Sequence, residues 1–189
     1  EITISTSESD GSPIISVSGE ITEGDQDKFR NFARKAPKAL VFLDSPGGLI
    51  QPAIEIGKLI YYNEMTTIVE DADCASACGL IWLAGETRVI LPNGRVGFHA
   101  VYFSQSKLQQ TVSSSGNALV GAYLGELKFN SKIIEYATAA SPKSMKWLTE
   151  PDAKEIDLTA LFLDKKDKAI NAHNAAIASV TKSGGGATP

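Results

Sequence analysis

Short apolar runs alternate with amphipathic segments over the first hundred residues. The runs are rich in β-branched residues, and the segments between them carry apolar residues at helical spacing. The expected strands are residues 14–19, 39–43, 65–69, 87–91 and 96–98, the expected helices are residues 24–34, 49–61 and 76–84, and residues 71–75 are expected to form a loop. Such alternation predicts βαβ units around a mainly parallel sheet.

The pattern changes in the second half of the chain. Residues 104–117 are rich in Ser and Gln and are expected to form a loop, whereas residues 118–140 are consistent with one long helix. A short helix over 151–155, a last strand over 158–163 and a polar helix over 165–178 are expected to follow. We therefore expect a single domain over residues 1–181 and a flexible tail over 182–189, where Gly and Ser leave no apolar area to bury.

Charge and composition exclude several classes of protein. The 189 residues include 18 Lys and Arg against 22 Asp and Glu, giving a formal net charge of −4, which disfavours nucleic acid as a partner. No apolar run approaches the roughly 20 residues of a membrane-spanning helix, so we expect a soluble protein. The chain begins with Glu1 and shows no basic-then-apolar leader, and we expect it to be the mature or trimmed form of a longer product.

Common cofactor and metal motifs are missing from the sequence. It contains no G-x-G-x-x-G, no G-x-x-x-x-G-K-[ST], no H-E-x-x-H and no C-x-x-C. Only two His and two Cys are available, so a zinc site would need ligands from distant segments. We expect neither a cofactor nor a metal ion.

Three short segments each supply one part of an acyl-transfer site. Ser76 lies between a loop and an apolar helix, where the amide of Ala77 has no partner within the helix and can donate to a developing oxyanion. Gly47 and Gly48 follow an apolar strand, and a glycine amide can approach a reacting carbonyl closely because no Cβ intervenes. Two such amides would form an oxyanion hole.

A serine hydroxyl also needs a base, and imidazole suits that role at neutral pH. His99 follows the expected strand 96–98 and is the better candidate, while His173 lies in a polar segment typical of a solvated surface. Each feature alone has a structural alternative. Ser76 can cap its helix, His99 can be a core residue, and S-P-G-G is a common turn.

Taken in order, these segments resemble a known family. Residues 44–48 (DSPGG), 75–77 (ASA) and 91–99 (LPNGRVGFH) resemble segments of the Clp protease proteolytic subunit family, and residues 147–153 (WLTEPDA) are more weakly similar to its F-L-S-x-x-E-A segment. The resemblance implies the α/β ClpP/crotonase fold, with repeated ββα units, a mainly parallel sheet core and a protruding oligomerisation helix, here residues 118–140.

The resemblance also implies roles for individual residues. Ser76 corresponds to the nucleophile, His99 to the general base, and the amides of Gly47 or Gly48 and of Ala77 to the oxyanion hole. The family's third member is an Asp, whereas this chain has Met145 at the matching position. The site is then a Ser-His dyad, or another group orients His99. The candidates for such a group are Asp152, Glu135, Asn130 and Ser144.

Cys74 and Cys78 flank the serine. In an oxidising compartment they would close a small disulfide loop around Ser76, and the alternative is a pair of small buried side chains. The C-x-S-A-C arrangement resembles ClpP-like proteins that are predicted to lie in the bacterial periplasm. This resemblance implies an exported, periplasmic protein.

The leading functional hypothesis is an oligomeric serine peptidase that acts on peptides or unfolded proteins through an acyl-enzyme on Ser76. Two alternatives remain open at this point. One is a crotonase-type enzyme that acts on acyl thioesters with the same pair of amides, and the other is a catalytically weak or inactive peptide-binding relative, which the missing Asp favours. Nothing in the sequence identifies a surface for an ATPase partner.

Overall fold

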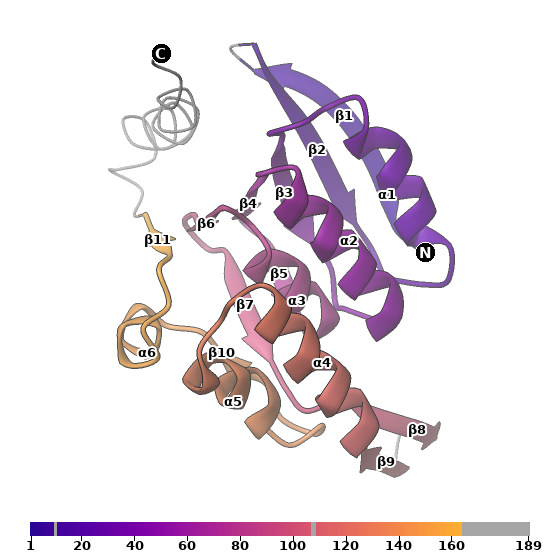
Figure 1. Ribbon diagram of the computed structural model, residues 1–189, viewed down its shortest axis with the longest axis vertical. Helices are drawn as coiled ribbons and strands as arrows, with labels where there is room; N and C mark the ends of the chain where they lie inside the picture. The colour runs from indigo at the N-terminus through magenta and orange to yellow at the C-terminus, as the bar shows by residue number, and fades with distance from the viewer. Residues whose placement is uncertain (10, 107–108, 164–189) are drawn as a thin grey trace, which may run out of the picture.

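The computed structural model describes residues 1–9, 11–106 and 109–163. Its centre is a six-stranded sheet in the order β1-β2-β3-β4-β6-β11 (Figure 1). β1 and β2 are antiparallel, and the other neighbouring strands are parallel. The strands are β1 (Thr3–Ser9), β2 (Ser12–Ser18), β3 (Leu40–Asp44), β4 (Thr66–Val69), β6 (Thr87–Ile90) and β11 (Leu161–Phe162). The expected α/β architecture with a mainly parallel sheet is confirmed.

Three helices contribute to the main hydrophobic core of the molecule. They are α1 (Asp25–Ala33), α2 (Ile50–Tyr62) and α3 (Ala77–Leu83), with α1 and α2 side by side in Figure 1. Every residue of α3 is buried, which explains why its sequence is apolar throughout rather than on one face. Trp82 is fully buried there, and its indole N–H donates to the Val89 carbonyl oxygen at 3.2 Å.

A second sheet of three short strands lies beside the first. β5 (Asp73–Ala75) runs parallel to β7 (Arg95–Phe98), and β10 (Lys146–Trp147) is antiparallel to β7. The segment expected as a loop over 71–75 therefore contains a strand. In the register of β5 and β7, Ala75 pairs with Gly97, so the residues that follow the two strands leave the same edge of the sheet.

The expected loop over 104–117 is wrong. Tyr102–Ser106 (β8) and Gln109–Val112 (β9) form a hairpin, and α4 (Ser114–Glu126) starts directly after it. The hydroxyl of Ser113 accepts a hydrogen bond from the Gly116 amide at 2.9 Å and so caps this helix.

The single helix expected over 118–140 is also wrong. α4 ends at Glu126, and α5 (Ser131–Ala139) begins after a turn in which Lys128 has a positive φ of 64°. The side chain of Asn130 accepts from the Ile133 amide and caps α5. A residue in the left-handed conformation ends one helix and a capping Asn begins the next, and the spacing of apolar residues alone does not reveal either.

The last described elements are α6 (Glu150–Glu155), which confirms the helix expected over 151–155, and β11, which is shorter than the strand expected over 158–163. Thr149 and Asp152 form a capping box at the start of α6. The helix expected over 165–178, the tail over 182–189, the domain boundary at residue 181 and His173 lie outside the described residues.

Candidate active site

Ser76 occupies a sharp turn between β5 and α3. Its backbone has φ 58° and ψ −122°, a strained combination for a residue with a side chain. The turn is held by its main chain, because the Ser76 amide donates to Gly97 O at 2.8 Å and the Ser76 carbonyl accepts from the Gly79 amide at 2.9 Å. The side chain makes no capping hydrogen bond. Its hydroxyl is therefore not used to cap α3, and a strained strand-to-helix turn of this kind presents a serine hydroxyl outward.

The S-P-G-G segment packs directly against this turn. Gly47 has φ 97°, and a Cβ built on it would lie 2.7 Å from Ser76 Cβ and 2.6 Å from the Ala75 carbonyl oxygen. Gly48 has φ 142°, and a Cβ there would lie 2.1 Å from the Ile21 carbonyl oxygen. Both positions require glycine because of backbone conformation and close approach.

Hydrogen bonding distinguishes the two glycine amides. The Gly47 amide donates to the Ser45 hydroxyl at 3.1 Å, and the Leu49 amide donates to Ile21 O at 2.9 Å. The amides of Gly48 and Ala77 have no acceptor among the described residues. These two N–H groups are the ones left available to a ligand.

His99 follows β7 and lies at the same sheet edge as Ser76. Its Nδ1 is 2.8 Å from the Ala100 carbonyl oxygen, and its ring centroid is 5.4 Å from that of Tyr102 at an interplanar angle of 39°. A carbonyl oxygen can only accept, so Nδ1 carries the hydrogen and a neutral ring presents the Nε2 lone pair. Among the described residues no hydrogen bond joins this ring to the Ser76 hydroxyl.

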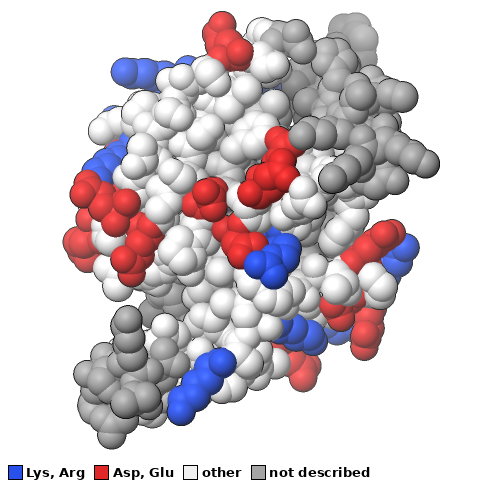
Figure 2. All heavy atoms as spheres, turned by 180° about the vertical axis from the view of Figure 1, so that it is seen from behind, with Lys and Arg blue, Asp and Glu red and all other residues white. Residues whose placement is uncertain are grey.

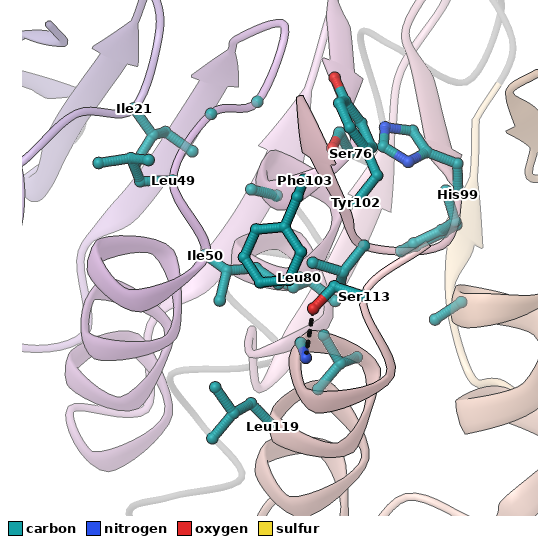
Figure 3. A pocket seen from close by; sticks show the side chains of 18 of the residues that line it. Ile21, Leu49, Ile50, Ser76, Leu80, His99, Tyr102, Phe103, Ser113 and Leu119 are labelled. Atoms are coloured by element: carbon teal, nitrogen blue, oxygen red, sulfur yellow. Dashed lines mark hydrogen bonds between the residues drawn. The ribbon is translucent and has the colours of Figure 1, made fainter. Parts of the chain in front are cut away.

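These groups line one pocket of about 820 Å³. Ser76, Ala77, His99 and both glycines contribute to its wall, and Figure 3 shows Ser76, His99 and Tyr102 gathered at one end. The rest of the wall is mainly apolar, with contributions from Ile21, Leu49, Ile50, Leu80, Phe103 and Leu119. The structure thus brings the serine, imidazole and amide donors together from three separate segments.

The four candidates for orienting His99 make no hydrogen bond to it within the described part of the chain. Asp152 accepts from Thr149 and from the Tyr136 hydroxyl, and the Thr149 hydroxyl chiefly holds the pKa of Asp152 below its ordinary value. Asn130 caps α5, and Ser144 donates to Ser141 O at 3.1 Å.

The fourth candidate, Glu135, is exposed. Met145, which stands where the resembled family has its Asp, lies over Gly97, since a Cβ there would be 2.7 Å from the Met145 Cγ. No carboxylate among the described residues therefore bonds to the imidazole.

Cys74 and Cys78 form a disulfide in the structure, with Cα atoms 5.1 Å apart. Both side chains are fully buried, one in β5 and the other in the first turn of α3. The bond therefore spans the Ser76 turn from inside the core.

Several site residues did not emerge from the sequence. Tyr102 packs on the His99 ring, and Leu49, Phe103 and Leu119 line the pocket while remaining partly open to solvent. Leu49 begins the segment expected as a helix, and its exposure is visible only in the structure. Phe103 and Tyr102 carried no signal in the sequence because they border a stretch expected to be a loop.

The described residues show neither a metal cluster nor a membrane span. No three His, Cys, Asp or Glu side chains of that part of the chain gather where they could hold a metal ion. Each described helix is too short or too polar to cross a bilayer.

Solved structures with similar folds were compared with this chain. A serine-to-alanine variant of the 1510-N membrane-bound stomatin-specific protease superposes with a TM-score of 0.60 at 20% identity, covering 78% of this chain and 77% of the protease. A lysine-to-alanine variant of the same protease, in complex with a substrate peptide, gives the same TM-score and identity over 78% and 73%. The ClpP protease catalytic domain from Plasmodium falciparum gives 0.58 at 21% identity over 81% and 86%.

The chain has the fold of ClpP-like serine proteases. No protein-family model matches the sequence, and no curated protein matches it. Because only about one residue in five is identical, these comparisons show a shared fold and no more. The chemistry of this chain is therefore argued from its own site.

Proposed function

We propose that this chain is a serine peptidase that cleaves peptide bonds through an acyl-enzyme on Ser76. One observation carries the proposal: a serine hydroxyl that does not cap its helix, on a strained turn, shares a pocket with an imidazole and with two main-chain amides that have no acceptor among the described residues. Each of these parts meets a separate demand of acyl transfer, namely a nucleophile, a base and an oxyanion site.

In the proposed reaction, Nε2 of His99 accepts the hydroxyl proton as Ser76 Oγ bonds to the substrate carbonyl carbon. The carbonyl π electrons move onto the oxygen, which the amides of Gly48 and Ala77 stabilise. Collapse of this intermediate breaks the C–N bond, and the leaving nitrogen takes the proton from Nε2. Water then bonds to the acyl carbon as its proton passes to Nε2 of His99, and collapse of the second intermediate breaks the bond from the acyl carbon to Ser76 Oγ, which takes the proton back from Nε2.

Gly48 rather than Gly47 is the second oxyanion donor in this proposal. The Gly47 amide already donates to Ser45, whereas the Gly48 amide has no acceptor among the described residues. Gly47 instead lets the segment approach Ser76 closely enough for its neighbour to reach the same oxygen.

Labelling with a fluorophosphonate probe tests the proposal. We expect the native chain to be labelled at one site and Ser76→Ala to be unlabelled. Ser115→Ala is the matched control, because Ser115 lines the same pocket from α4 and its removal should leave labelling intact. A native chain that is folded but does not react would contradict the proposal.

An unreactive chain would favour a peptide-binding protein without catalysis. The specific observation behind that second candidate is Met145, an uncharged side chain at the place where an orienting carboxylate is expected. Peptide binding that survives Ser76→Ala, together with no hydrolysis by the native chain, would support it.

We further propose a homo-oligomer in an oxidising, periplasmic compartment. Exposed apolar side chains on the β8–β9 hairpin and α4, including Phe103 at 65% and Leu119 at 49% exposure, are suited to contact a second copy. The buried disulfide supports export. Light scattering that finds only monomers would oppose the oligomer.

On the face shown in Figure 2, acidic and basic side chains form small separate groups rather than one basic band.

A further inference from the structure

His99 needs a partner that fixes its ring, and the structure offers no carboxylate for that role among the described residues. A general base of this type must keep Nε2 unprotonated and must hold its plane toward the nucleophile. Without an orienting group, the imidazole would exchange tautomers and rotate about χ2.

The Ala100 carbonyl oxygen occupies the position of such a partner, 2.8 Å from His99 Nδ1. Main-chain atoms can orient a ring only if their own peptide group is fixed. The Ala100 amide donates to Ala140 O at 2.8 Å, and the Ser113 amide donates to Val101 O at 2.7 Å. The segment is therefore anchored to the end of α5 and to the start of α4.

Asn117 holds the peptide group itself. Its Oδ1 accepts a hydrogen bond of 2.9 Å from the Val101 amide, which belongs to the same peptide plane as the Ala100 carbonyl. The result is a continuous chain from the Asn117 side chain through one peptide group to His99 Nδ1. Hydrogen bonds in series polarise one another, so the bond to Asn117 makes the Ala100 oxygen a better acceptor.

We propose that Asn117 is a positioning residue, which fixes the Ala100–Val101 peptide and through it orients His99 in place of a triad carboxylate. The Tyr102 ring packs beside the imidazole, with the ring centroids 5.4 Å apart, and restricts its rotation. This inference rests on the proposed peptidase function, since it assigns the group that makes His99 competent as a base.

The test compares Asn117→Leu with Asn117→Asp. Leucine has a similar volume and no acceptor, so kcat is expected to fall about tenfold or more while KM changes less than about twofold. Aspartate keeps an acceptor oxygen at the same place, so the kcat of Asn117→Asp should equal or exceed the native value. Asn63→Leu is the matched control, because Asn63 is also half-buried and also bonds main chain, but at the end of α2 away from the pocket.

Nitrogen NMR of the imidazole supplies a readout that does not depend on turnover. With only two His in the sequence, His99 can be assigned by comparison with a His173→Gln variant. The native chain should show His99 protonated at Nδ1, and Asn117→Leu should reduce that population. Native His99 protonated at Nε2 would overturn the inference, as would an Asn117→Leu variant with unchanged kcat and tautomer.

The outcomes separate this inference from the peptidase proposal. A native chain that fails to react with fluorophosphonate contradicts the peptidase, while the tautomer measurement still decides the role of Asn117. If Asn117→Leu fails to fold, Asn117→Asp decides: native or higher kcat supports the inference, and a tenfold loss overturns it.

Discussion

Gly47 is packed so tightly against Ser76 that any side chain there would displace the proposed nucleophile. Its position is set by two requirements at once, a φ of 97° and a distance of 2.7 Å from a hypothetical Cβ to Ser76 Cβ. The first requirement concerns stability and the second concerns the geometry of the site. Substituting alanine at Gly47 and at Gly24 can separate the effect on stability from the effect on the geometry of the site.

Gly47→Ala should lower the rate of peptide hydrolysis by more than its effect on stability explains. A left-handed alanine costs roughly 1–2 kcal/mol of folding free energy, and a shift of the Ser76 turn by about 1 Å lowers the rate about a hundredfold. Gly24→Ala is the control, since Gly24 has φ 84° and open space around its Cβ position. The melting temperature should fall in both variants, and further in Gly47→Ala because its Cβ also meets the backbone of Ala75, but only Gly47→Ala should show the large loss of peptide hydrolysis. Equal activities in the two variants would contradict this account.

Met145 offers a gain-of-function test at the same scale. Lys146 pairs with Phe98 in the register of β10 and β7, and extending that register by one residue puts Met145 opposite His99. Met145→Asp should then place a carboxylate beside the imidazole and raise kcat by about tenfold, because a charged acceptor stabilises the imidazolium that forms in the reaction.

Met145→Asn controls for shape and polarity without charge, and it should give a smaller increase. Steady-state hydrolysis of a peptide substrate measures both variants. A Met145→Asp enzyme no faster than Met145→Asn would show that a carboxylate at this position does not assist His99.

At the scale of elements, the β5–β7 pair explains how Ser76 and His99 meet. The two strands are parallel, and each ends directly before one of these residues. Carboxyl ends of parallel strands lie at one edge, so a register in which Ala75 pairs with Gly97 delivers both side chains to the same pocket. The disulfide joins Cys74 of β5 to Cys78 of α3.

Removing the disulfide should weaken both stability and activity. The Cys74→Ala/Cys78→Ala variant opens a loop with a sequence separation of 4, and the loss of this constraint on the unfolded chain is expected to cost about 2 kcal/mol. Labelling by fluorophosphonate should also slow, because the strained Ser76 turn loses a covalent support. Chemical denaturation and labelling rates measure the two effects.

Reduction of the native chain supplies the control for that variant. A dithiol should lower the stability of the native chain to that of the double variant and should leave the variant itself unchanged. The sequence has only two cysteines, so the denatured, unreduced native chain should titrate with no free thiol. Two free thiols would rule out the bond.

At the scale of the whole molecule, one buried carboxylate fastens the amino-terminal segment to the core. Asp25 is fully buried at the start of α1 and accepts hydrogen bonds from the amides of Ile2 and Thr22 and from the Thr22 hydroxyl. Burial alone would raise the pKa of Asp25, but the hydrogen bonds from Thr22, Ile2 and Lys28 together hold it below its ordinary value of 3.8.

Because the pKa of Asp25 is lowered in the native state, the free energy of unfolding depends on pH. The native state binds this proton less readily than the unfolded chain, so the stabilisation is present above pH 3.8 and is lost as the pH falls through the lower native pKa. Asp25→Asn should cost about 1–3 kcal/mol of unfolding free energy at neutral pH, with a smaller difference near pH 3. Asp27→Asn, on the exposed side of the same helix, should cost under about 1 kcal/mol. Urea denaturation at both pH values checks this.

Apolar periodicity predicted the parallel sheet and the helices α1, α2 and α3, because buried strands and helices leave regular patterns of apolar residues. It missed β1, whose side chains are almost all exposed and therefore carry no such pattern. It also merged α4 and α5, since the turn at Lys128 and the Asn130 cap are local backbone features within an apolar stretch.

Residue types in the sequence were sufficient to identify Ser76, His99, the glycine pair and the cysteines as candidates, because each has chemistry or conformational freedom that few other residues provide. Only the tertiary structure showed which of them meet, which glycine amide has no acceptor among the described residues, and which groups we propose to orient His99. That last role falls to a main-chain carbonyl and to Asn117, in a helix expected to start later. Every residue has a main-chain carbonyl, so only the packing of distant segments can single one out.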